Sequence, residues 1–250
     1  MNIVRPPGIV KGMRIVVFGA NGPTGHQLLD QALAAGHQVV AVTRRPDTMP
    51  ARDGLTVAGA DVADAEAVSA AVAGADAVLS TLGVPFSRRP ITVYSTGARS
   101  IIAAMREHGV RRLVVVSSGA TEPAQHPSGS ALFNYVLQPF IVNVLGRTLY
   151  DDMRRMEKLV RESGLDWTVM RPSGLLDTPG VTDYLVAEDF ADGRFTSRAD
   201  LAASMLAQLS DDRFVGKAAA VITPSAQPNL LGMIWREART KKRPPQPTRR

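Results

Sequence analysis

Three glycines at a spacing of three, Gly19, Gly22 and Gly25, are the residues whose types and spacing first suggest a chemistry. They follow an apolar run and precede a segment with helical spacing. At such a junction one glycine allows a tight turn, another lets the backbone approach a diphosphate, and the last lets the helix pack close to the strand. The free N–H groups and positive dipole end of the helix would face the phosphates. The predicted dinucleotide-binding turn comprises Gly19, Asn21, Gly22, Pro23, Thr24 and Gly25.

Two arginines bear on which dinucleotide this turn would hold. In NAD-binding proteins of this kind an acid stands roughly 20 residues past the glycines and binds the ribose 2′-hydroxyl. Here Arg44 and Arg45 occupy that place, in "VVAVTRRP". Guanidinium groups suit a 2′-phosphate because they form charge-assisted, fork-shaped hydrogen bonds. The pattern favours NADP(H) over NAD(H); the alternative is that both arginines are solvated loop residues.

These residues need a scaffold, and the sequence predicts strands that alternate with helices. Apolar, β-branched runs predict strands within 13–18, 39–43, 55–58, 75–81, 111–119, 165–172 and 217–224. Periodic segments predict helices within 24–35, 65–72, 93–108, 151–164 and 197–209, and the segment between Pro172 and the last of these helices reads as irregular. Such alternation is typical of an α/β protein with a doubly wound parallel sheet, an NAD(P)-binding Rossmann fold.

Ligands of such sheets bind beyond the carboxyl ends of the strands. Asp61 and Val62 follow the third predicted strand, and we expect them to meet the adenine. Thr81, Leu82 and Gly83 follow the fourth strand, and we expect them beside the ribose next to the nicotinamide.

Composition and the distribution of charge along the chain indicate how it is divided into a domain and its terminal extensions. We expect a single Rossmann domain over 13–235 with small C-terminal elements on the substrate side, an N-terminal extension over 1–12, and a basic tail over 236–250. The tail holds seven Lys or Arg and one acid, so it carries the whole net charge of +6 and leaves a neutral body. A neutral body argues against nucleic acid as a partner. The Pro-rich tail reads as disordered, a solubility tail or a segment that binds an acidic surface.

Other observations exclude several kinds of function. The chain has no cysteine, which excludes disulfides, thiolate metal sites and cysteine nucleophiles. The four histidines show no metal-binding spacing, so we predict no metal. The first residues lack a signal-peptide pattern, and no run of about 20 apolar residues predicts a membrane span. We expect a cytoplasmic protein whose oligomeric state, monomer or dimer, stays open.

The polar residues after the fifth predicted strand could do chemistry. Tyrosine-dependent short-chain dehydrogenases combine a serine at this place with a Tyr-x-x-x-Lys pair, in which the lysine lowers the pKa of the tyrosine. Here Ser117 and Ser118 end the strand, but Tyr135 is followed at the fourth position by Pro139 and Tyr150 by Arg154. We interpret Tyr150 as a packing residue at a helix start, with a proton donor as the alternative.

The chain resembles known families over roughly residues 14–223. "GANGPTG" resembles the "GATGxTG" turn of atypical short-chain dehydrogenases/reductases. "VYSTGARSIIAAMREHGVRRLVVVSSGA" and "MRRMEKLVRESGLDWTVMRPSGLLD" resemble the flavin reductase/beta-type biliverdin reductase family and its NmrA-like, NAD(P)H-binding relatives. This resemblance implies direct hydride transfer from NADPH to an acceptor lying over the nicotinamide. It also implies that Ser118 corresponds to a serine beside the substrate, and that Ser173 replaces a family histidine.

The sequence therefore predicts an NADPH-dependent oxidoreductase that passes hydride to a flavin, quinone or similar small conjugated acceptor, with Ser118 and Ser173 in the substrate pocket. A non-catalytic NADP(H) sensor, as among NmrA-like proteins, is the main alternative, because the Tyr-Lys pair is absent. An NAD-dependent sugar epimerase or dehydratase is a third, against which Arg44 argues. The apolar segment 131–150 reads as a core helix or lid, with a partner or membrane-surface patch as the alternative.

Overall fold

The apolar runs form the strands of one large sheet. The computed structural model describes residues 12–87, 89–122 and 140–225. Within these residues, eight strands follow the order β3-β2-β1-β4-β5-β6-β10-β8. Their bounds are β1 Arg14–Phe18, β2 Gln38–Thr43, β3 Leu55–Gly59, β4 Ala77–Ser80, β5 Arg112–Val116, β6 Asp166–Pro172, β8 Leu185–Glu188 and β10 Lys217–Ile222. All neighbours are parallel except β8, which pairs antiparallel with β10 at one edge.

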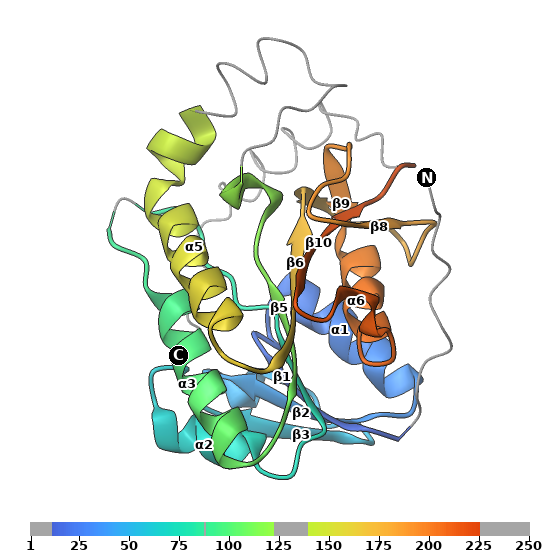
Figure 1. Cartoon of the computed structure of the whole chain (residues 1–250). Helices are drawn as coiled ribbons and strands as arrows, with labels where there is room; N and C mark the ends of the chain where they lie inside the picture. Colours follow the sequence, from blue (N-terminus) through green and yellow to red (C-terminus); the bar gives the residue numbers. More distant parts are fainter. Residues whose placement is uncertain (1–11, 88, 123–139, 226–250) are drawn as a thin grey trace, which may run out of the picture.

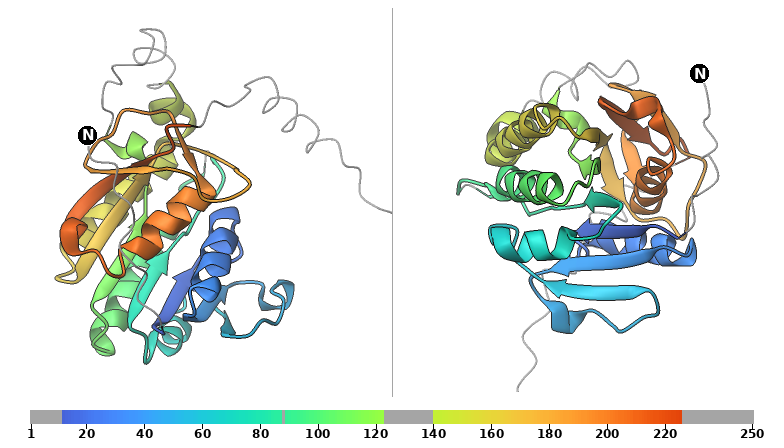
Figure 2. Two further views of the ribbon diagram at one scale, coloured as in Figure 1. Left: turned by 90° about the vertical axis from the view of Figure 1, so that its right-hand side faces the viewer. Right: turned by 60° about the horizontal axis from the view of Figure 1, so that its bottom comes forward.

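Helices cover both faces of this sheet. Figure 1 shows the sheet between two groups of helices, and the right-hand view of Figure 2 shows the same layers from below. One face carries α1 (Pro23–Ala34) and α6 (Arg198–Ala207), and the other carries α2 (Ala65–Val72), α3 (Val93–Glu107) and α5 (Arg147–Arg161). Because the helices lie on both sides, the strands are buried on both faces, which explains their nearly continuous apolar sequences.

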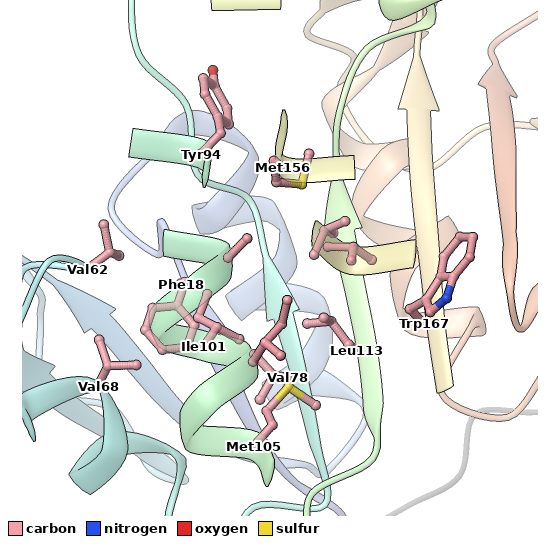
Figure 3. Close-up of a cluster of buried hydrophobic side chains, with 14 of the residues drawn as sticks. Phe18, Val62, Val68, Val78, Tyr94, Ile101, Met105, Leu113, Met156 and Trp167 are labelled. Carbon is pink, nitrogen blue, oxygen red and sulfur yellow. The ribbon is translucent and has the colours of Figure 1, made fainter. Parts of the chain in front are cut away.

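Side chains of successive strand residues enter two separate cores. On β1, Val16 and Phe18 pack in a cluster with α2, α3 and α5, whereas Ile15 and Val17 pack in a second cluster with α1 and α6. Figure 3 shows part of the first cluster, with Phe18 close to Ile101 from α3. The alternation follows from the two-residue period of a strand, and it fixes the register of β1 between the two helical layers.

The structure confirms the predicted fold class, including the alternation of strands and helices as far as β6. The segment between Pro172 and α6, expected to be irregular, contains three short strands, whereas the helix and the strand predicted after it are present as α6 and β10. Strands β7 (Gly174–Leu176) and β9 (Phe195–Ser197) form a small parallel pair, and β8 joins the main sheet. These strands have three or four residues, which is too short for an alternating pattern to be recognised.

Several predicted segments extend beyond the described residues. The N-terminal extension lies outside them apart from Gly12, and the basic tail lies wholly outside. Of the apolar segment 131–150, residues 131–139 also lie outside. The remainder forms a π-helical turn, Ile141–Leu145, and the first turn of α5. No helix in the described ranges is both long and apolar enough to cross a membrane.

Candidate functional site

The glycine-rich turn joins β1 to α1 and is built on close backbone approaches. Gly19 has a φ of +76°, and a Cβ there would lie 2.7 Å from the carbonyl carbon of Thr81. A Cβ on Gly25 would lie 2.3 Å from the carbonyl oxygen of Gly19. Larger residues would therefore push α1 off the sheet. Gly22 is the N-cap of α1 and has no side chain to cap the first N–H groups of the helix. Those groups and the dipole of α1 thus suit an anion.

A cleft of about 710 Å³ opens along the carboxyl edge of the sheet. It is lined from the ends of β1, β2, β4, β5 and β6 and from α3 and α5. The strand order changes direction between β1 and β4, because β2 and β3 lie to one side of this pair and β5 and β6 to the other. Such a switch point is where open α/β sheets bind their ligands. The cleft therefore lies where the topology alone would place a site.

At one end of the cleft, two arginines follow β2. Arg44 and Arg45 are exposed and line the cleft, and among the described residues neither side chain has an ion-pair partner. Asp61 is exposed nearby and accepts a hydrogen bond from the backbone N–H of Ala63 at 2.9 Å, whereas Val62 is buried. Two cations with no counter-ion in the described part of the chain make this end attractive to an anionic group.

The middle of the cleft is shaped by the end of β4. The Thr81 hydroxyl donates to the carbonyl oxygens of Phe18 at 3.1 Å and Gly19 at 3.2 Å. Its side chain thus ties β4 to the glycine turn, and Leu82 and Gly83 continue the wall beyond it. On the other side of the turn, the Asn21 side-chain amide donates to the Thr48 hydroxyl at 2.9 Å. These contacts hold the turn in a fixed position between two loops.

The serines after β5 have different surroundings. Ser117 lines the cleft, but its hydroxyl donates to Glu157 at 2.6 Å and the residue is buried. The Ser118 oxygen accepts from the backbone N–H of Ala120 at 3.2 Å and caps a short 3₁₀ turn, Gly119–Thr121. Burial raises the pKa of the Tyr150 phenol, the Ser118 side chain lies close enough to oppose that rise, and Tyr150 lines the same part of the cleft. Ser118 and Tyr150 are thus the pair of hydroxyls that faces the cleft here.

Tyr150 combines core packing with a place at the cleft. It is buried, as expected of a packing residue, but it also lines the cleft beside Ser118. Gly146 allows this, because a Cβ there would lie 2.5 Å from the Tyr150 ring and 2.8 Å from the Phe86 ring. Arg154, at the position of the missing lysine, donates to the Thr121 carbonyl at 2.9 Å and pairs with Asp151 at 3.0 Å. Its charge is therefore engaged elsewhere.

A buried ionic network supports the serine turn from below. Arg171 at the end of β6 donates two hydrogen bonds of 2.8 Å to Glu122 and two, of 2.5 and 3.2 Å, to Glu157. Glu157 also accepts from Ser117 at 2.6 Å and from Thr121 at 3.0 Å. Burial opposes ionisation of Glu157, but the hydrogen bonds from Arg171, Ser117 and Thr121 outweigh it, and the pKa of Glu157 lies below its usual value. The network connects β5, β6 and α5 directly beneath Ser118.

A second buried carboxylate joins the two helices that wall the cleft. Asp152, on α5, is fully buried and accepts from the N–H groups of Tyr94 at 2.9 Å and Ser95 at 3.2 Å. It thereby caps the start of α3, whose own N-cap, Thr92, makes no side-chain cap. The Tyr94 hydroxyl in turn accepts from the N–H of Val84 at 3.3 Å. Val84 and Tyr94 both line the cleft, so Asp152 fixes one wall against the other.

Apolar side chains surround the Ser118–Tyr150 pair. Leu149 and Met153 from α5 are buried, and Phe86 and Leu175 are 54% and 36% exposed at the cleft. The Phe86 and Tyr150 rings lie 6.2 Å apart between centroids. Ser173 also lines this end, where its hydroxyl donates to the Gly193 carbonyl at 3.0 Å. Such a surface suits a flat apolar ligand with a few polar contacts.

The structure brings the predicted site residues together. All of them line the cleft except Gly25, which lies beneath it as the close contact between α1 and the glycine turn. Sequence reasoning missed Phe86, Tyr94 and Arg198, which also line the cleft. None of these three had a recognisable signal, because each lies outside the glycine, arginine and serine motifs and reaches the cleft only through the fold.

Fold and cleft together define a nucleotide-binding Rossmann protein. Comparison with known proteins is more specific: the chain belongs to the NAD(P)H-binding family, whose pattern matches residues 19–212. A Bacillus subtilis relative, YhfK, named as an uncharacterized sugar epimerase, is 28% identical over 209 residues, covering 80% of this chain and 89% of that protein.

Two solved structures are also similar. A wide-type short-chain dehydrogenase/reductase from Veillonella parvula, in complex with NADP, is similar with a TM-score of 0.72 and 20% identity. The match covers 87% of this chain and 99% of that chain. At so low an identity, the similarity establishes a shared fold only. ChuY, an anaerobillin reductase from Escherichia coli, has a TM-score of 0.69 at 26% identity and covers 86% of this chain and 99% of its own. The family and the fold predicted from the sequence are thus confirmed.

Proposed function

We propose that the protein is an NADPH-dependent oxidoreductase that passes hydride directly to a flavin, quinone or similar conjugated acceptor. The observation that carries this proposal is the build of the cleft. It has two arginines without an ion-pair partner among the described residues at one end, beside them a glycine turn whose helix has no side-chain cap, and an apolar end with the Ser118 and Tyr150 hydroxyls. These parts match in order a 2′-phosphate, a diphosphate and a redox-active ring.

The residues present fit an NADP(H) dinucleotide. Gly19 and Gly25 allow the turn to pack tightly against Thr81 and against the start of α1, where any Cβ would collide with backbone. Gly22 brings no side chain that would cap the first N–H groups of α1. Arg44 and Arg45 supply the charge for the 2′-phosphate, and Asp61 with Val62 forms the wall for the adenine. When bound, the nicotinamide supplies a hydride to an acceptor. The NADP complex of the Veillonella protein, which shares this fold, is consistent with this assignment.

The chain's own residues then position the acceptor and handle its proton. Leu149, Met153 and Phe86 exclude water from the acceptor face, and Ser118 and Tyr150 donate hydrogen bonds to it. Reduction of a flavin or quinone consumes one hydride and one proton, and Tyr150 is placed to give the proton and regain it from solvent. The reductase activity named for ChuY supports the same class of reaction.

The name of the YhfK relative raises the epimerase alternative. Epimerases of the tyrosine-dependent type use the Tyr-x-x-x-Lys pair and retain NAD. Here the corresponding Arg154 is bound to Thr121 and Asp151, and Arg44 stands where an NAD-selecting acid would be. Both observations favour the reductase.

The test is NADPH oxidation by the purified protein, followed at the nicotinamide absorbance, with a panel of flavins and quinones, alongside a titration of NADPH binding. We expect turnover with at least one acceptor and slower turnover with NADH. NADPH binding without turnover on any acceptor would contradict the reductase and favour the sensor. No binding of either nucleotide would overturn the assignment of the cleft itself.

A further inference from the structure

One cation in the cleft has no part in the proposed cofactor site. Arg198 is the first residue of α6 and lines the cleft together with Ser173 and Leu175. It reaches this place because β9, which ends at Ser197, pairs with β7, which begins directly after Ser173. β9 lies near the carboxyl end of β6 in Figure 1. Arg198 therefore belongs to the end of the cleft where the acceptor would lie.

Different elements carry this arginine and the two arginines at the other end of the cleft. Arg44 directly follows β2, whereas Arg198 directly follows β9, whose partner β7 begins two residues after the end of β6. Arg198 is thus separate from the charge that the 2′-phosphate would use.

The Arg198 side chain is available to an incoming anion. Its Nη1 lies 2.9 Å from the Asp177 carboxylate, and the two side chains are 23% and 78% exposed. In the described part of the chain, Asp177 is the one acceptor found for this guanidinium, which has five N–H donors. An ion pair with so exposed a partner is weak, so an oxyanion that enters the cleft can replace Asp177 or share the guanidinium with it.

We propose, resting on the function proposed above, that Arg198 binds an anionic group of the acceptor and selects acceptors that carry one. The substrate class is a flat conjugated ring with a phosphate or carboxylate substituent. The ring would lie among Phe86, Leu149 and Met153, and the oxyanion would lie on Arg198 beyond Ser173. A planar guanidinium recognises both oxyanions through paired hydrogen bonds.

The experiment measures equilibrium binding of matched ligand pairs to the NADP⁺-saturated full-length protein. Riboflavin and flavin mononucleotide share one ring system and differ by a phosphate, and a naphthoquinone with its carboxylate derivative forms a second pair. We expect the charged member of at least one pair to bind more tightly. Arg198→Gln should weaken that member by roughly 10- to 100-fold and leave the uncharged member within about twofold, whereas Arg198→Lys should restore part of the loss.

Two control variants and a cofactor titration sharpen the result. Arg111→Gln removes a guanidinium that is also paired at 2.9 Å with an exposed carboxylate, but Arg111 precedes the amino end of β5, opposite the cleft. This variant should change the affinity of neither ligand. Asp177→Asn should preserve or strengthen binding of the charged member. NADP⁺ affinity measured without acceptor separates the two possible sources of the oxyanion, because a loss there in Arg198→Gln would place the cofactor diphosphate on Arg198 and overturn the acceptor assignment.

The proposal is also overturned if the charged and uncharged members of both pairs bind equally to the wild-type protein, or if none binds. Its failure is distinguishable from failure of the proposed function. A charge preference that depends on Arg198 but comes with no NADPH oxidation would retain the anion site and reject the reductase. Turnover without a charge preference would do the reverse.

Discussion

At Tyr150, burial and the neighbouring Ser118 side chain act on one hydroxyl in opposite directions. Burial raises the pKa of the phenol, and Ser118 opposes that rise without cancelling it. The net pKa lies above its usual value, and Arg154 is held by Thr121 and Asp151. Tyr150 is therefore protonated throughout the neutral range. It is suited to donate a proton to a reduced acceptor but not to accept one from an alcohol.

We predict that Tyr150→Phe lowers kcat about 10²-fold or more and leaves the dissociation constant of NADPH unchanged, because it removes a proton donor and keeps the ring. Steady-state kinetics and a binding titration provide the measurement. In wild type, the rate should not rise with pH through the neutral range from ionisation of this residue. A variant with wild-type kcat would show that the acceptor takes its proton from water.

A second prediction concerns Arg44. Arg44→Glu should lower the ratio of kcat/KM for NADPH to that for NADH, because it replaces a cation with an acid at the expected 2′-phosphate position. The change should be at least tenfold, which matches a lost charge-assisted hydrogen bond of about 1.5–3 kcal/mol. Arg52→Glu is the control, since Arg52 pairs with Asp30 outside the cleft. An unchanged ratio would mean that Arg44 is a solvated loop residue.

The site residues that the sequence could predict are those recognised from a motif of a few neighbouring residues. Gly19, Gly22 and Arg44 are recognised from their distance to the ends of β1 and β2, because the end of a parallel strand determines where the next few residues lie. From the sequence, the role of Tyr150 could be inferred only from the residue four positions later, Arg154. That test takes no account of Gly146, whose missing side chain leaves space for the tyrosine ring at the cleft. Arg198 enters the cleft only through the pairing of β7 with β9.

At the scale of elements, the contact between α1 and the glycine turn is the tightest feature of the cleft. We predict that Gly25→Ala destabilises the protein by about 1–3 kcal/mol or more and weakens NADPH binding, because the new Cβ would meet the Gly19 and Ala20 carbonyls at 2.3 and 2.5 Å. Gly180→Ala is the control, since nothing lies within 4 Å of a Cβ there. Chemical denaturation and a binding titration measure both effects, and equal behaviour of the two variants would contradict the prediction.

The network that joins β5, β6 and α5 predicts a dependence on pH. Glu157 has a pKa below its ordinary value of 4.5, so its contribution to stability is present above about pH 4.5 and is lost as the pH falls through the lowered pKa. Glu157→Gln should lower the free energy of unfolding by about 3–5 kcal/mol at neutral pH, because it leaves Arg171 with less compensation.

The difference between wild type and Glu157→Gln should narrow as the pH falls below 4.5, because the wild-type carboxyl then becomes neutral as well. Urea denaturation at a series of pH values provides the measurement. Glu162→Gln, at an exposed position on the same stretch of chain, should stay within about 0.5 kcal/mol of wild type. A difference that does not depend on pH would show that Glu157 is not ionised in the folded protein.

Helices and strands long enough to show a hydrophobic periodicity could be predicted from the sequence, and the short strands could not. The helix at Ala65–Val72 has the predicted bounds, since the Asp64 side chain accepts from the Ala67 N–H at its start. In contrast, β7 and β9 are strands because they pair with each other, and neither sequence alone predicts a strand. The buried pairs of Glu157 with Arg171, and of Asp152 with the start of α3, also join distant segments. No local sequence pattern predicts such pairings.

At the scale of the whole molecule, a ligand in the cleft would contact both halves of the sheet. The glycine turn and Arg44 belong to the β1–β3 side, and Ser118 and Tyr150 belong to the side of β5 and α5. Because a bound dinucleotide would span the switch point between β1 and β4, it should stabilise the protein as one unit.

We predict that NADP⁺ at 100 times its dissociation constant raises the midpoint of thermal unfolding by roughly 5–11 °C. The corresponding free energy is about 2.7 kcal/mol, and a chain of this size shifts by about 2–4 °C per kcal/mol. NAD⁺ at the same concentration should give a smaller shift, and Arg44→Glu should reduce the difference. Differential scanning fluorimetry measures this, and equal shifts for both nucleotides would contradict selection for the 2′-phosphate.

The place of β10 in the sheet has a consequence for the order of assembly during synthesis. β10 lies between β6 and β8, although it is made after both. Until residue 222 has left the ribosome, β6 has an open edge and β8 has no neighbour in the main sheet. Neither β8 nor the open edge of β6 can complete its pairing before β10 is available. A chain interrupted before Lys217 would present two unpaired edges, which are the usual templates for aggregation.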